Sequence, residues 1–166
     1  MRILLALTTA IICFFIGTAI SQRKKVRVSQ LAKLLSMLEE MRAVISFNAP
    51  TIREILNILS ERTDFSDFGF LCEVKAEYEK NPDIHRAWRS AALQAEGFSE
   101  KDRRLLIGIG EQLGTTDVHG QLLMLEAAEK SAQNCLDEAR SDYSSRGGMI
   151  QKTWTLCGIA VGILLL

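Results

Sequence analysis

Few residues in this chain of 166 amino acids could catalyse a reaction or bind a metal ion. His85 and His119 are its only histidines. Neither has a serine, a cysteine or an acidic residue at a spacing diagnostic of a nucleophile or a metal site. The sequence offers no catalytic constellation, so we predict a protein that is not an enzyme and has no metal site.

A group of glycines is the pattern closest to a nucleotide-binding loop. Gly108, Gly110 and Gly114 are spaced G-x-G-x-x-x-G, and the apolar residues around them recur at helical spacing. A dinucleotide-binding loop instead has the spacing G-x-G-x-x-G and follows a β-strand. We therefore predict no cofactor and expect these glycines to let two helices approach closely.

The four cysteines, at positions 13, 72, 135 and 157, lack metal-ligand spacing. We expect reduced and mostly buried thiols. A disulfide between Cys72 and Cys135 would form only if the central part of the chain faced an oxidising compartment.

Charge is unevenly distributed although the formal net charge is zero. Residues 28–152 contain 15 basic and all 20 acidic residues, which gives a net charge of −5. A nucleic-acid-binding protein would present a basic face. The acidic centre therefore indicates a partner other than nucleic acid.

The two ends of the chain are apolar. Residues 3–20 form an uncharged run of 18 residues, which as a helix reaches about 27 Å, close to the thickness of the hydrocarbon layer. Basic residues follow at once, at positions 23, 24, 25 and 27. The positive-inside rule then keeps the centre of the chain in the cytoplasm. The alternative is a cleaved signal peptide, since Ala19-Ile20-Ser21 has the small residues of a cleavage site.

The C-terminal run, residues 153–166, is shorter, with Trp154 and Lys152 placed to extend it at the membrane interface. We predict membrane anchors over residues 1–22 and 149–166, each a transmembrane helix, around a cytoplasmic domain over residues 27–147.

The centre reads as six helices in an all-α antiparallel bundle. Pro50, the turn at residues 64–67, the Asn81-Pro82-Asp83 segment and Gly97 separate the first five, and Thr51, Ser99 with Asp102, and Asp117 supply helix N-caps. The third helix is expected over residues 65–80. The predicted core faces have one apolar residue every three or four positions: Leu31, Leu34, Leu35, Leu38, Met41, Ile45, Ile52, Ile55, Leu56, Leu59, Phe68, Leu71, Cys72, Tyr78, Ile84, Ala87, Trp88, Ala91, Leu105, Leu106, Ile109, Leu113, Leu122, Leu125, Ala132, Leu136, Ala139 and Tyr143. Glu39 and Glu40 are expected on a solvated face.

One segment is unusual for a joint between helices. Residues 110–117 read Gly-Glu-Gln-Leu-Gly-Thr-Thr-Asp, with two glycines and two acids where the fifth and sixth helices meet. It is either a tight turn with capping acids or a structured corner that binds a partner. The candidate docking residues are Gly110, Glu111, Gly114, Asp117, Arg103 and Arg104.

These residues also carry a resemblance. The segment Phe98-Ser99-Glu100-Lys101-Asp102, the stretch 110–117 and Gln121 resemble the stage III sporulation protein AB family, and so does the layout of the whole chain. That family is in turn similar to the cytoplasmic domains of the inner-membrane platform proteins of type II secretion and type IV pilus systems. Those carry a Gly-Glu-x-x-Gly stretch, matched here by Gly110, Glu111 and Gly114. Platform proteins usually have two such domains and this chain has one, which leaves open whether it works alone or as a homo-oligomer.

The resemblance implies a non-enzymatic component of a channel-like complex linking mother cell and forespore. It implies a location in the outer forespore membrane, with a secretion-type ATPase of the same operon and other stage III sporulation proteins as partners. The alternative is a membrane-anchored adaptor or regulatory helical domain with no role in a transport machine.

Overall fold

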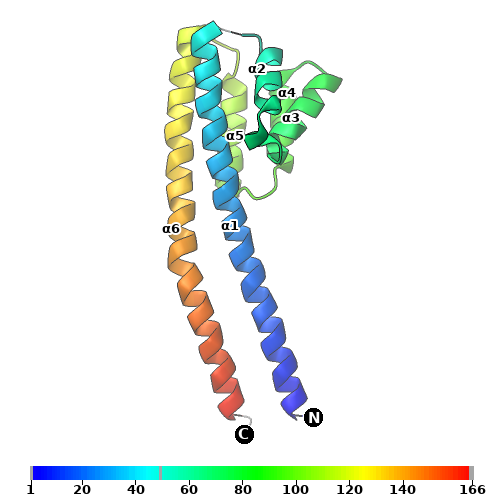
Figure 1. Cartoon of the computed structure of the whole chain (residues 1–166), viewed down its shortest axis with the longest axis vertical. Coiled ribbons are helices and arrows are strands. Elements are labelled where there is room, and N and C mark those ends of the chain that lie inside the picture. The colour runs from blue at the N-terminus through cyan, green and yellow to red at the C-terminus, as the bar shows by residue number, and fades with distance from the viewer. Residues whose placement is uncertain (1, 49, 165–166) are drawn as a thin grey trace. The chain divides into compact units, whose positions relative to one another are not determined.

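A computed structural model describes the backbone of residues 2–48 and 50–164 and the side chains of residues 22–48 and 50–145. Over these ranges the chain is all α-helical and has no β-strand, as predicted. The elements in order are α1 (Arg2–Asn48), α2 (Ile52–Glu61), the 3₁₀ helix η1 (Thr63–Phe65), α3 (Gly69–Lys80), α4 (Ile84–Gln94), α5 (Glu100–Gln112) and α6 (Val118–Leu164) (Figure 1).

The first and last helices are each longer than the sequence suggested. We expected bundle helices flanked by separate anchors, whereas α1 and α6 each run on into an apolar end segment as one helix. No proline interrupts either junction. The apolar runs 3–20 and 153–166 lie outside the residues whose side chains are described. Among the residues described in full, no helix is long and apolar enough to cross a bilayer.

The chain divides into two compact units, Met1–Val28 with Glu138–Leu166, and Ser29–Asp137. The second unit holds the short helices and most of the buried apolar residues. Within it α3 packs against α2 and α4, and α4 packs against α5. Figure 1 shows α2 to α5 gathered beside the part of α1 that belongs to this unit.

Local signals set the helix ends, as predicted. Thr51 begins α2 with a capping box: its N–H donates to Glu54 Oε2 at 2.8 Å, and the Glu54 N–H donates to Thr51 Oγ1 at 3.4 Å. The backbone N–H and the hydroxyl of Thr51 hold the pKa of Glu54 below its usual value. Ser99 and Asp102 form a second capping box at α5, and Asp83 caps α4.

Most of the predicted core positions are buried, including Trp88, and seven are not. Cys72 and Tyr143 are exposed, and the other five are half-buried: Leu35, Ile52, Tyr78, Leu105 and Leu122. The chain forms η1 and a turn before α3, so α3 starts four residues later than predicted. In that register the α3 residues that face the core are Phe70, Leu71 and Val74.

Ion pairs join charged side chains of α1 to the segment between α2 and α3 and to α6. Lys33 Nζ lies 2.5 Å from Asp67 Oδ1, and Arg62 pairs with Glu40. Glu40 is therefore paired with a cation, whereas we expected it to be solvated. On the α6 side, Arg42 Nε lies 2.8 Å from Glu129 Oε1. Burial raises the pKa of Glu129, and the Arg42 guanidinium acts in the opposite direction.

Candidate functional site

The contact between α4 and α5, here called the seam, is built around one aromatic side chain. Trp88 is 1% exposed, and its ring meets the Phe70 ring edge to face at a centroid distance of 5.1 Å. Its indole Nε1–H donates to the backbone carbonyl of Leu106 at 2.7 Å, so the polar atom of the buried indole is satisfied.

A glycine makes room for that indole. A Cβ added to Gly110 would lie 2.2 Å from Trp88 Cδ1, whereas a Cβ added to Gly108 would meet nothing within 4 Å. The expectation that glycines let two helices approach is confirmed for Gly110 and wrong for Gly108. The Gly110 carbonyl lies 2.8 Å from His85 Nδ1, so this histidine also contacts the seam.

The joint between α5 and α6, here called the corner, is closed by a buried amide. Gln121 is 7% exposed, and its Oε1 accepts from the N–H of Gly114 at 3.1 Å. Its Nε2 donates to the Gln112 carbonyl at 3.0 Å and to Thr116 Oγ1 at 2.9 Å. Gly114 has φ +76°, the left-handed conformation expected of a glycine just past a helix end.

Two of the predicted docking side chains are engaged inside the fold. Asp117 caps α6 by accepting from the N–H of Gly120 at 2.9 Å, as predicted. Arg103 donates through its guanidinium to the carbonyl of Ala95, with its Nη2 at 3.0 Å. This bond ties the start of α5 to the loop that follows α4. Both side chains have local structural roles.

The comparison with known families covers nearly the whole chain. The family model of stage III sporulation protein AB matches residues 2–166. The chain belongs to the stage III sporulation protein AB family. No curated protein and no solved structure matches it. Membership implies a role in sporulation, in the context of the mother cell, and confirms the resemblance to this family that was drawn from the sequence.

In this member of the family, two predicted docking side chains face solvent. Glu111 is 59% exposed and lies 3.3 Å from an Arg89 guanidinium nitrogen, and Arg104 Nε lies 3.8 Å from Glu100 Oε1. Ion pairs this exposed contribute little to stability. Glu111 and Arg104 can therefore break these ion pairs and bind charged groups of another protein at a small cost in free energy.

Sequence reasoning missed the structural importance of Gln121 and the contribution of Arg89. Gln121 lies four residues before Leu125 on the buried side of α6, and a polar residue at a core position is the signal that could have identified it. Arg89 is brought to Glu111 only by the packing of α4 on α5, for which the sequence carries no local signal. No cluster of residues that could hold a metal ion is found in the described part of the chain.

Proposed function

We propose that this protein is a non-enzymatic membrane platform component of the sporulation complex that links mother cell and forespore. Its helical domain, residues 27–147, would dock a cytoplasmic secretion-type ATPase. The observation that carries the proposal is the family match over residues 2–166, joined to an exposed charged surface on a rigid corner.

The membrane part of the proposal rests on the sequence. The apolar runs 3–20 and 153–166 would enter the outer forespore membrane, and the basic residues at positions 23, 24, 25 and 27 would hold the domain in the cytoplasm. Each end segment continues from a helix of the Ser29–Asp137 unit. A force received by the unit would therefore reach the membrane through helix rather than through a loop.

The docking part rests on preorganisation. Trp88 packs against α5 from Leu106 to Gly110, and Gln121 fixes the end of this helix. Glu111 lies between these two fixed points and is exposed. A charged group held on rigid backbone loses little entropy when a partner binds, which favours it as a docking group.

A binding experiment tests the docking surface. The full-length Glu111→Ala variant should melt like the wild type, because the exposed Glu111–Arg89 pair contributes little to stability. It should bind the ATPase of the same operon about tenfold more weakly, as expected for loss of one interfacial charge. Glu79→Ala, which removes an exposed carboxylate of α3, is the matched control.

Normal ATPase binding by Glu111→Ala would remove this residue from the docking surface. Failure of the wild-type chain to bind the ATPase would favour the adaptor role instead.

A labelling experiment tests the membrane topology. Cys72 is exposed, so a thiol reagent that cannot cross membranes should label it in permeabilised mother cells but not in intact ones. Labelling of Cys72 in intact cells would place the domain outside the cytoplasm and contradict the topology.

A further inference from the structure

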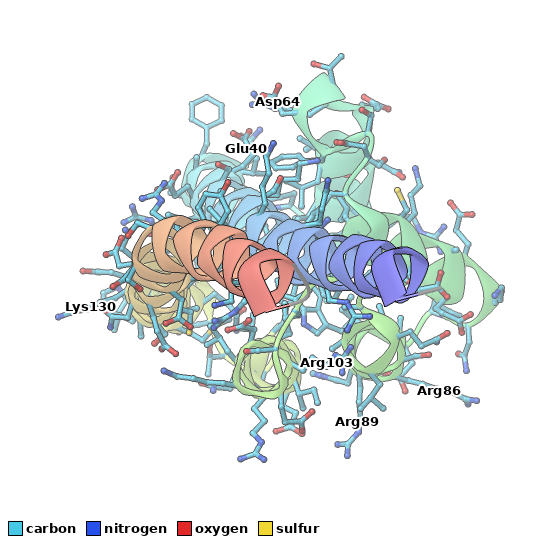
Figure 2. All side chains as sticks on the ribbon, turned by 90° about the horizontal axis from the view of Figure 1, so that it is seen from below. Glu40, Asp64, Arg86, Arg89, Arg103 and Lys130 are labelled. Atoms are coloured by element: carbon cyan, nitrogen blue, oxygen red, sulfur yellow. The ribbon has the colours of Figure 1, made fainter. Side chains whose placement is uncertain are left out.

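One face of α4 is exposed, and in the described part of the chain its only ion pair joins Arg89 to Glu111. Arg86, Arg89 and Leu93 are spaced i, i+3 and i+7, so they lie along one side of the helix, here called the basic stripe. All three are exposed, Leu93 by 58%, while the opposite side of α4 is buried around Trp88. Figure 2 shows Arg86 and Arg89 projecting outward from α4.

This stripe stands out because the unit around it is acidic. Residues 29–137 contain 12 basic and 18 acidic residues, a net charge of −6, yet α4 itself has no acidic residue. Arg86 forms no ion pair within the described residues, and Arg89 has only the exposed Glu111 at 3.3 Å. The stripe is thus a local attraction for negative charge on a unit whose net charge is negative.

The same unit carries a stripe of opposite charge. Ile58 and Glu61, spaced i and i+3 on α2, and Asp64 of η1 are exposed, and the two acids form no ion pair within the described residues. This acidic stripe has the same composition as the basic one, two charges and one aliphatic side chain. Because α3 packs between α2 and α4, one copy of the unit cannot join its own stripes. Figure 2 shows Asp64 on the side of the unit opposite Arg86 and Arg89.

We propose that the two stripes are the halves of a contact between copies of this chain, in which the basic stripe of one copy binds the acidic stripe of the next. Leu93 and Ile58 would supply the apolar part of the contact and the four charged residues its orientation. Since the two surfaces differ, the contact is heterologous and leaves an unused stripe at each end, so association continues to a ring or a chain instead of stopping at a dimer. The inference goes beyond ATPase docking and does not depend on it.

The contact is small and rich in exposed charge, which makes it weak in dilute solution and sensitive to salt. Two charge-reversed variants of the full-length chain test it in a mild nonionic detergent at low ionic strength, with sedimentation velocity as the readout. One is Arg86→Glu with Arg89→Glu, and the other is Glu61→Arg with Asp64→Arg. Each alone should self-associate at least about tenfold more weakly than the wild type, because like charges then face each other.

The decisive sample is an equimolar mixture of the two variants. The reversed α4 stripe of the first variant, now acidic, then meets the reversed stripe of the second variant, now basic. The unchanged α4 stripe of the second variant meets the unchanged acidic stripe of the first. Both contacts are attractive, so the mixture should form alternating assemblies larger than a dimer. Lys130→Glu, which changes an exposed cation of α6 outside both stripes, should associate like the wild type (Figure 2).

A wild-type chain that stays monomeric at every concentration would overturn the inference. A mixture that associates no better than its separate components would also overturn it, as would a wild-type degree of association in either variant. The Glu61 and Asp64 variant lies away from Glu111, so it should keep its ATPase binding. Failure of this inference can therefore be told apart from failure of the proposed function.

Discussion

Helix α5 is held by two contacts of opposite chemistry, one along its side against α4 and one at its C-terminal end. At the seam, Trp88 fills the space above Gly110, and the contact depends on shape. At the corner, Gln121 satisfies three backbone and side-chain groups, and the contact depends on hydrogen bonds. The seam should therefore be intolerant of changes in volume, whereas the corner should be intolerant of lost polar groups.

The largest expected effect lies in the core beside the seam. Leu106 is fully buried and its carbonyl accepts from Trp88, whereas its neighbour Leu105 is only half-buried. Leu106→Ala should lower the free energy of unfolding by about 2–5 kcal/mol, because it leaves a cavity. Leu105→Ala should cost clearly less. Chemical denaturation of both variants checks this, and equal losses would mean that the register of α5 is wrong.

The next effect isolates shape at the seam. Gly110→Ala adds one methyl group against Trp88 and should destabilise the fold by about 1–3 kcal/mol through overpacking. Gly108→Ala adds the same group to the same helix in open space, so it should stabilise by about 0.5–1 kcal/mol through helix propensity. Melting temperatures that shift in opposite directions confirm the close approach. A stabilised Gly110→Ala variant would disprove it.

A smaller effect isolates hydrogen bonding at the corner. Gln121→Leu keeps much of the side-chain volume but leaves the Gly114 N–H and the Gln112 carbonyl without this partner. The loss should be about 1–2 kcal/mol, the cost of leaving such groups unsatisfied. The exposed Gln112, changed to Ala, is the control and should change little. If Gln121→Leu melts like the wild type, the buried amide does not close the corner.

The smallest effect concerns the surface between the two contacts. Glu111→Ala should change the free energy of unfolding by less than about 0.5 kcal/mol, since its pair with Arg89 is exposed. Gly114→Val is the contrasting change in the same corner. It should destabilise the fold, because a β-branched residue is disfavoured at φ +76°. A large stability loss in Glu111→Ala would show that the residue serves the fold and would weaken its assignment to docking.

The difference between seam and corner also explains what the sequence could predict. Helix ends depend on residues close in sequence, here Thr51, Pro82, Ser99 and Asp117. The helix ends predicted from these residues were confirmed. The register of α3 was wrong because a 3₁₀ turn over residues 63–65 has no strong local signature. Among the long-range contacts, Gly110 was expected to let another helix approach closely. Nothing in the sequence indicated that Trp88 is the residue that packs against it.

The candidate site divides in the same way. Gly114 and Asp117 were assigned correctly as helix-ending and capping residues, because each acts within a few residues of itself. Arg103 was predicted as a docking residue without knowledge of its hydrogen bond to the Ala95 carbonyl. The sequence could not show this bond, because only the folded chain brings the two groups together. Tertiary hydrogen bonds decide which charged side chains can bind a partner protein. The periodicity of apolar residues in the sequence carries no information about these hydrogen bonds.

The burial of Trp88 gives the molecule an optical reporter. The chain has two tryptophans, and Trp154→Phe would leave Trp88 as the sole indole emitter. A ring that is 1% exposed and packed on Phe70 emits at short wavelength, and the emission moves to longer wavelength when water reaches it. Fluorescence from this variant would therefore show, in an intact membrane and without a label, whether α4 leaves α5 when a partner binds.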